Sequence, residues 1–181
     1  MRMIAPVTNG VLTRRDDPAT AIDERLHDQR SRDAGINGNA VNTPILSLFA
    51  GTVLTAADRN DGYGKAVRVE GTVTLSKARI LTAHEPWPMT RLPQHSLSDH
   101  LSWVGLPDDW LLTLHVRALY AHANALYVKQ GQIVSQFEPL MGMGNTGRSS
   151  GNHLHLKFRL LDLPEPICFV DPLPLFVWSE L

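Results

Sequence analysis

The sequence is poor in three features that would each point to a particular class of protein. It contains one cysteine, Cys168, in 181 residues, which excludes an internal disulfide and a zinc site built from several cysteines. Seventeen basic residues face 18 acidic ones, a formal net charge of -1, and this balance argues against nucleic acid or an acidic membrane surface as the main partner. No stretch approaches the roughly 18 apolar residues that span a bilayer, so we expect no membrane insertion.

The first residues also lack a feature, because residues 1–6 contain no apolar run of the kind found in secretory signals. We therefore expect a chain that is made in the cytoplasm and does not leave by the general secretory route. The hydrophobic share of 43% is too high for intrinsic disorder, and the length suits one domain with a sizeable core.

From residue 44 onward the sequence is dominated by short apolar or alternating runs separated by proline and glycine, which is typical of an all-β sandwich or barrel. Before it, residues 1–43 are charged and mostly irregular, with a short helix expected at about 18–30. Residues 83–110 contain four prolines and three histidines and interrupt the pattern, which indicates an insertion on the surface. The expected strands are 45–49, 52–56, 66–70, 72–81, 111–121, 126–128, 132–134, 138–143 and 153–160.

The strongest local signal for chemistry is a pair of histidines after a glycine-rich turn. His153 and His155 are two positions apart on an expected strand, so their side chains share one face about 7 Å apart. His122 lies on a second expected strand. Each has an ordinary alternative, a surface position for the pair and a hydrogen-bonded place at the edge of the core for His122. Together they form a three-histidine constellation of the residue type most used as metal ligand and general base.

Several segments occur in the order that is known from one family. They are Asp33-Ala34-Gly35-Ile36-Asn37, Asn42-Thr43-Pro44-Ile45 with Ala50-Gly51-Thr52-Val53, Gly62-Tyr63-Gly64, Leu119-Tyr120-Ala121-His122, residues 128–134, residues 144–151, His153-Leu154-His155 and Val170-Asp171-Pro172. By these segments the chain, from Asp33 to Phe176, resembles the lysostaphin-type (LytM-like) peptidoglycan metalloendopeptidases. The resemblance implies a two-sheet, mostly antiparallel β architecture with the site in a groove across one sheet.

The resemblance also assigns roles to the site residues. In the family, zinc is held by the histidine and aspartate of a His-x-x-x-Asp segment and by the second histidine of His-x-His. Carried over, His155 is the retained ligand, while His122 and His153 are the retained catalytic pair that acts as general base or stabilises the transition state. This chain has Asp33 in place of the ligand histidine and Asn37 in place of the ligand aspartate.

Those two replacements predict a degenerate metal site. A carboxamide is a poor zinc donor without charge, and the carboxylate of Asp33 is shorter than an imidazole. Four zinc ligands together contribute about 10–16 kcal/mol, so loss of two good ones weakens binding by roughly four to five orders of magnitude. We therefore expect no cofactor, with zinc as the cofactor if the protein is active. Substitute ligands from His27, His84, His95 or His100 lack the family spacing.

The resemblance divides the chain into an N-terminal arm, residues 1–32, and a peptidase-like domain, residues 33–181, with an insertion at about 71–110. Trp87, Trp103 and Trp110 fall in or beside this insertion. They form either a small core under a long loop or a docking surface for another protein, since exposed tryptophan is typical of interface anchors.

Two functions remain open. In the first, the chain is a degenerate peptidoglycan-endopeptidase-like domain without zinc or catalysis, a structural or docking component of a phage tail or baseplate-like assembly. Its partners are then virion tail proteins, with peptidoglycan peptides as a further ligand, and its location is a virion or phage-tail-like particle. The missing secretory signal favours this setting by analogy. In the second, the chain is an active zinc metalloendopeptidase that cleaves peptide cross-links of the bacterial cell wall.

Overall fold

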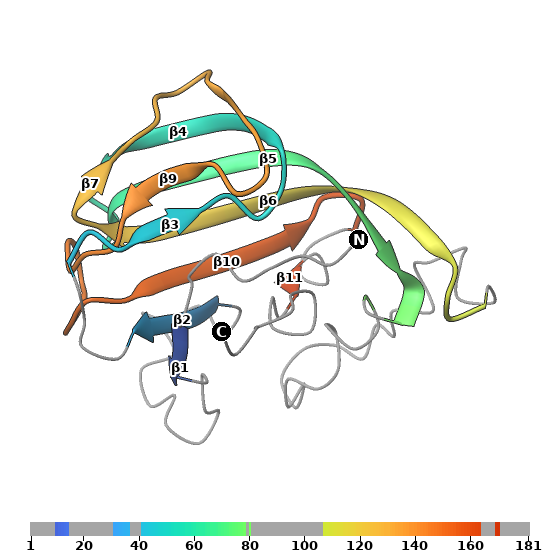
Figure 1. Ribbon diagram of the computed structural model, residues 1–181, viewed down its shortest axis with the longest axis horizontal. Coiled ribbons are helices and arrows are strands. Elements are labelled where there is room, and N and C mark those ends of the chain that lie inside the picture. The colour runs from blue at the N-terminus through green and yellow to red at the C-terminus, as the bar shows by residue number, and fades with distance from the viewer. Residues whose placement is uncertain are drawn as a thin grey trace.

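The computed structural model describes residues 10–14, 31–36, 41–78, 80, 107–163 and 169–170, and it describes side chains for 41–78, 80 and 107–163. Strands β1 to β11 form two antiparallel sheets (Figure 1). The predicted all-β, two-sheet, mostly antiparallel lysostaphin-type fold is confirmed. Among the described residues there is no helix with the length and hydropathy needed to span a membrane.

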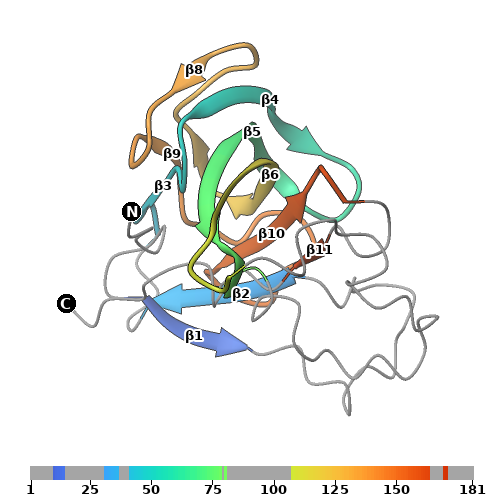
Figure 2. The same cartoon turned by 90° about the vertical axis from the view of Figure 1, so that its right-hand side faces the viewer.

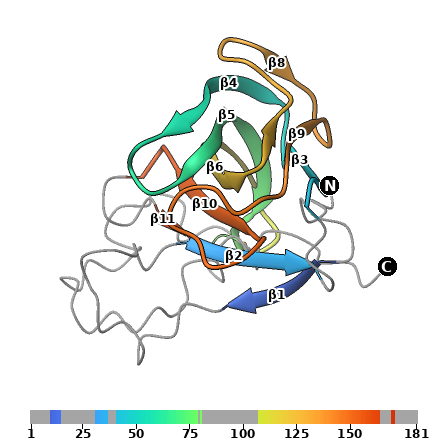
Figure 3. The ribbon, with the colours of Figure 1, turned by 90° about the vertical axis from the view of Figure 1, so that its left-hand side faces the viewer.

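The larger sheet has the strand order β1-β2-β10-β6-β5-β4-β8, and β11 pairs with β10. Its strands are β1 Gly10–Arg14, β2 Ser31–Ile36, β4 Gly51–Arg59, β5 Gly64–Ser76, β6 Leu111–Ala123, β8 Ile133–Val134, β10 Leu154–Leu160 and β11 Phe169–Val170. The smaller sheet has the order β3-β9-β7, with β3 Pro44–Leu46, β7 Ala125–Leu126 and β9 Pro139–Gly142. Figures 2 and 3 show the large sheet curving from β4 down to β1, with β3 and β9 beside its upper strands.

Alternation along the central strands gives the large sheet two different faces. On one face Val67 and Val69 of β5, Ala118 and Tyr120 of β6 and Phe158 of β10 are fully buried in the main core. Residues one position away pair across the same three strands, for example Arg68 with Leu119 and Leu119 with Lys157. Because side chains alternate along a strand, these residues lie on the opposite face.

The first residues of the predicted insertion, about 71–110, continue a strand of the large sheet. Residues 71–76 belong to β5 and pair with β6 as far as Ser76 opposite Leu111. The hairpin then continues, since Lys77 N–H donates to Trp110 O at 2.9 Å. Val73 and Leu75 are buried while Thr72 and Thr74 are exposed, so the alternation of β5 extends past the predicted start of the insertion at residue 71. Trp110 is half exposed, and Trp87 and Trp103 lie outside the described residues.

The N-terminal part contains sheet as well as irregular chain. β1, which falls inside the predicted arm of residues 1–32, pairs antiparallel with β2, and the predicted boundary at residues 32 and 33 falls within β2. The run Gly10-Val11-Leu12-Thr13-Arg14 contains β-favouring residues that complete the hydrogen bonds of β2. The helix expected at about 18–30 lies outside the described residues.

A buried tyrosine joins the large sheet to the chain that follows β3. Tyr120 is fully buried, and its Oη accepts a hydrogen bond from Leu48 N–H at 3.0 Å. Burial raises the pKa of Tyr120, so this hydroxyl stays protonated and keeps its partner over the ordinary pH range.

Replacing Tyr120 by phenylalanine tests this link. The variant Tyr120→Phe leaves the buried Leu48 N–H without its acceptor, so we expect a loss of about 1–3 kcal/mol in the free energy of unfolding, measured by urea denaturation. Tyr127→Phe is the matched control, because Tyr127 is 47% exposed, and its loss should stay within about 0.5 kcal/mol. Equal losses in the two variants would contradict the proposed role of Tyr120.

Candidate metal and catalytic site

Three histidines lie together at one end of the large sheet. His122 is near the end of β6, His155 is the second residue of β10, and His153 directly precedes β10. The His122 ring lies 4.8 Å from the His153 ring and 5.5 Å from the His155 ring, measured between centroids. One ligand atom from each of the three lies within 4.8 Å of the others. The structure therefore brings together all three predicted histidines, while their roles stay predictions.

Backbone geometry explains how His122 reaches the other two. His155 pairs with Ala121, so alternation alone would place His122 on the opposite face. His122 instead has a φ of 65°, in the left-handed region that non-glycine residues rarely adopt. Beside it the pairing of β5 with β6 shifts register between Lys65 and Val67, and such irregularities re-aim side chains. The irregular end of β6 is thus what allows the cluster to form.

Hydrogen bonds define which nitrogen carries the proton in two of the rings. Nδ1 of His122 lies 2.8 Å from Thr146 O, and Nδ1 of His153 lies 2.8 Å from Gly151 O. A carbonyl oxygen only accepts hydrogen bonds, so both Nδ1 atoms carry protons, and in the neutral rings Nε2 keeps its lone pair. Each Nε2 atom can therefore bind a metal or accept a proton.

The segment that carries Thr146 is held by the turn between β4 and β5. Thr146 Oγ1 donates to Ala123 O at 2.7 Å and accepts from Lys65 N–H at 3.0 Å. Nearby, Arg148 N–H donates to Gly62 O at 2.7 Å. These three contacts connect the turn, the end of β6 and the loop, so the carbonyl that orients His122 has a defined position.

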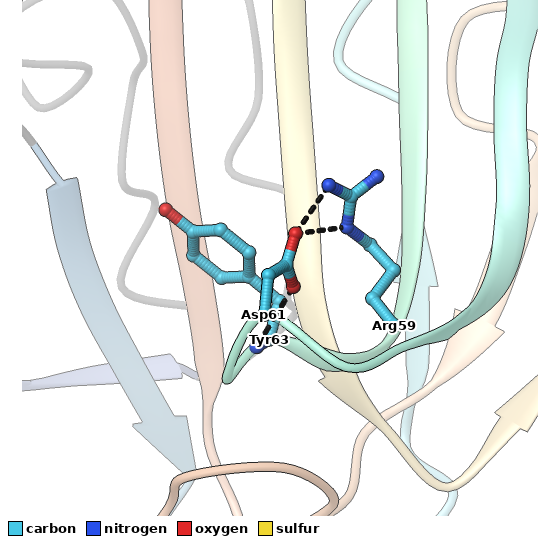
Figure 4. A network of polar contacts seen from close by, with 3 residues as sticks. All are labelled: Arg59, Asp61 and Tyr63. Atoms are coloured by element: carbon cyan, nitrogen blue, oxygen red, sulfur yellow. Dashed lines mark hydrogen bonds and ion pairs between the residues drawn. The ribbon is translucent and has the colours of Figure 1, made fainter.

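The same turn has its own polar network (Figure 4). Asp61 Oδ2 accepts from Arg59 Nε at 2.6 Å, and Asp61 Oδ1 accepts from Tyr63 N–H at 3.3 Å. The hydrogen bond from Arg59 lowers the pKa of Asp61. The Tyr63 ring points the other way, and its centroid lies 5.6 Å from that of His155. The turn therefore places an aromatic ring beside the histidine cluster.

Sequence reasoning does not assign roles to Tyr63 and Thr146. Both lie within segments that carry the family resemblance, but neither has the residue type that signals metal binding or proton transfer. Thr146 orients His122 through its backbone carbonyl, and its hydroxyl bonds only to backbone atoms of Ala123 and Lys65. These contacts exist only in the folded chain, so the sequence does not mark them.

The two replaced ligand positions are only partly described. Asp33 pairs with His155 across β2 and β10, which puts its backbone directly opposite the predicted retained ligand. The side chain of Asp33 and the whole of Asn37 lie outside the described residues. The pairing of β2 with β10 places the backbone of Asp33 beside His155. The role of Asp33 at a metal site stays a prediction.

The donor types decide which sets of residues fit zinc. Zinc in proteins is held by imidazole, thiolate and carboxylate groups, with about 2.0–2.1 Å to an imidazole nitrogen. The family positions offer one imidazole at His155, one carboxylate at Asp33 and a carboxamide at Asn37, and this set does not fit. The three histidines fit zinc in donor type and number, but this set uses the two that the resemblance assigns to catalysis.

The close approach of two glycines provides a test of how the cluster is supported. A Cβ atom on Gly147, which has a φ of 74°, would overlap Gly64 N and Gly62 O. Gly131 has a similar φ of 81°, but a Cβ atom there would have no neighbouring atom within 4 Å. The two positions therefore share the backbone strain and differ only in the steric overlap.

We expect Gly147→Ala to destabilise the protein by about 1–3 kcal/mol more than Gly131→Ala, because only the first pushes the loop off the turn. Urea denaturation measures this difference. Histidine ring signals in NMR spectra should shift in Gly147→Ala and stay unchanged in Gly131→Ala. Unchanged ring signals in both would mean that the loop does not position the cluster.

Comparison with known proteins finds a family match over part of the chain and solved structures with a similar fold. Residues 112–164 match the model of peptidase family M23. The catalytic domain of lysostaphin from Staphylococcus simulans is similar in structure, with a TM-score of 0.50, 17% identity and coverage of 96% of this chain and 88% of that one. Among proteins of curated function, none matches this chain in sequence.

Two further solved structures are similar over 99% of this chain. The solution structure of lysostaphin gives a TM-score of 0.59 at 16% identity and is covered over 57% of its length. The structure of the SpoIIQ-SpoIIIAH pore forming complex gives 0.58 at 15% identity, with 93% of that chain covered. At these identities the likeness concerns the fold. The family match covers the segment with all three histidines, so the predicted resemblance to the lysostaphin-type peptidases is confirmed over residues 112–164, and the fold is similar to that of lysostaphin.

Proposed function

We propose that this chain is a peptidase-like domain without peptidase activity, in which the family's zinc site has been lost and the domain serves as a structural or docking component of a larger assembly. The observation that carries the proposal is the register of β2 against β10. Asp33 stands opposite His155, and the resemblance gives this position to a ligand histidine.

The limited number of imidazoles supports the loss of catalysis. Members of family M23 are zinc metallopeptidases, and the resemblance needs His155 for the metal while His122 and His153 act on the reacting groups. Should the three histidines bind a metal themselves, the Nε2 lone pairs of His122 and His153 would be used as ligands. If His122 and His153 did not bind the metal, His155 would be its one imidazole ligand. Three imidazoles cannot all bind the metal and also leave two of them to act on the reacting groups.

The partners and the setting belong to the same proposal. We expect protein partners in a phage tail or similar virion particle, and peptidoglycan peptides as a further ligand. The fold occurs both in the catalytic domain of lysostaphin and in a structure described as a pore forming complex, so it is compatible with either kind of role. Half-exposed Trp110 favours docking, because exposed tryptophan is typical of interface anchors.

The alternative function is that of an active zinc endopeptidase for cell-wall peptides. It is favoured by the clustering of His122, His153 and His155, whose ligand atoms lie within 4.8 Å of one another, and by the hydrogen bonds from two Nδ1 atoms to carbonyl oxygens, which orient the rings. Zinc bound there would polarise the scissile amide and activate a water.

Zinc binding and peptidoglycan hydrolysis distinguish the two functions. We expect the wild-type protein to bind zinc with an affinity roughly four to five orders of magnitude below that of a complete site, and to release no peptides from purified peptidoglycan. The double variant Asp33→His/Asn37→Asp should regain zinc, measured by competition with a chelating dye. Adding His155→Ala to the double variant is the control and should remove the regained zinc.

Zinc-dependent release of peptides by the wild-type protein, lost in His155→Ala, would contradict the proposal and establish the alternative. Failure of the double variant to regain zinc would show that the site differs from the family in more than these two positions.

A further inference from the structure

One arginine on the face of the large sheet that carries the histidines has no counter-ion among the described residues. We call this the histidine face, and it includes the pairs His155–Ala121, Lys157–Leu119 and Arg68–Leu119. Arg59 is paired with Asp61, and Arg117 donates from Nε to Glu70 Oε2 at 2.9 Å. The side chain of Arg68, partly buried, makes no hydrogen bond or ion pair within the part of the chain that the structure describes.

The surroundings of Arg68 disfavour a positive charge. Burial lowers the pKa of Arg68, and the nearby charges of Arg59 and Arg117 lower it further. Asp61 acts in the opposite direction, but its carboxylate is already bound to Arg59. A guanidinium that is partly removed from water and repelled by two others is destabilising for the fold alone, and such arrangements are typical of binding sites.

Between Arg68 and the histidines the face has a buried apolar base and the partly exposed side chain of Lys157, whose Nζ lies 5.1 Å from the centroid of the Tyr63 ring. Leu119, Ala121 and Ala66 are buried there, with Tyr63 packed against them, as a second cluster separate from the main core. Tyr63 also lies 5.6 Å from the His155 ring between centroids. The face therefore has, in succession, the histidine cluster, the Tyr63 ring with Lys157 beside it, and Arg68.

The sheet geometry gives the spacing of these features. Arg68 pairs with Leu119, which is two residues from Ala121, and Ala121 pairs with His155. Two strand spacings of about 4.8 Å and two residue steps of about 3.3 Å separate the backbone positions of Arg68 and His155 by roughly 12 Å. An extended peptide covers this span in three to four residues, at about 3.3 Å per residue.

We propose that Arg68 binds a carboxylate of an extended peptide that lies across the histidine face, three to four residues from the peptide residue above the histidines. The planar guanidinium matches a carboxylate with two parallel hydrogen bonds, and the partly exposed Tyr63 ring contacts the peptide between the two ends. This assignment rests on the proposed docking function, because an uncut peptide remains bound, and it names an acidic peptide as the ligand class.

Peptide titration tests the assignment. The probes are acetyl-Gly-Gly-Gly-Gly-Glu-amide, its glutamine counterpart, and pentaglycine with a free carboxyl end. Comparison of the first and the last separates a side-chain carboxylate from a terminal one. NMR titration should show that wild-type protein binds at least one carboxylate probe about tenfold more tightly than the glutamine peptide, as expected for a charge-assisted contact. The Nε–H signal of Arg68 should shift on binding.

Three variants complete the design. Arg68→Gln should abolish the preference for carboxylate, and Arg68→Lys should retain part of it because the charge remains without the planar fork. Lys129→Gln is the matched control, since it removes one positive charge from an exposed position in the connection between β7 and β8. Amide spectra without peptide check that each variant is folded.

Equal affinity for the three probes, a preference that survives in Arg68→Gln, or no binding of any probe by the wild-type protein would each overturn the assignment. The proposed lack of peptidase activity is decided separately by zinc binding and peptidoglycan hydrolysis. Failure of the Arg68 assignment is thereby distinguishable from failure of the proposed function.

Discussion

The register of β10 between β2 and β6 is the constraint on which the site depends. In this register His155 stands opposite Ala121 on one side and opposite Asp33 on the other. Because side chains alternate, a slip by one residue would turn His155 toward the core and bring Leu156 or Leu154 to the site. Leu154, Leu156 and Phe158 are buried in the main core, so the packing of the core holds the histidine in place.

A second constraint, the close contact between the turn 59–64 and the loop 144–151, holds the other two histidines. Gly64 and Gly147 approach so closely that neither tolerates a Cβ atom, and Thr146 beside them orients His122 through its carbonyl. None of these contacts involves the replaced positions Asp33 and Asn37. This independence explains how a histidine cluster persists in a chain whose other family ligands have changed.

The strands can be predicted from the sequence more completely than the site. Alternation of buried and exposed residues identifies β5, β6 and β10 because each has one face in the core, and the spacing of His153 and His155 places both on one face. The convergence of His122 is not predictable from alternation, since a positive φ at His122 moves its ring to the other face, and only the family resemblance indicates it. The strand predicted over 72–81 runs past the observed end of β5 at Ser76 because no proline or glycine marks that end. β1 escapes prediction because its five residues form a strand only by pairing with β2.

The central claim is that the family's zinc position, formed by His155 with residues 33 and 37, no longer holds a metal while the histidine cluster remains. A crystal structure of the protein grown in excess zinc, with anomalous diffraction recorded at the zinc edge, tests it most directly. The account predicts no zinc peak shared by His155, Asp33 and Asn37. A zinc ion bound to those three residues, with His122 and His153 left free to act on substrate, would contradict it.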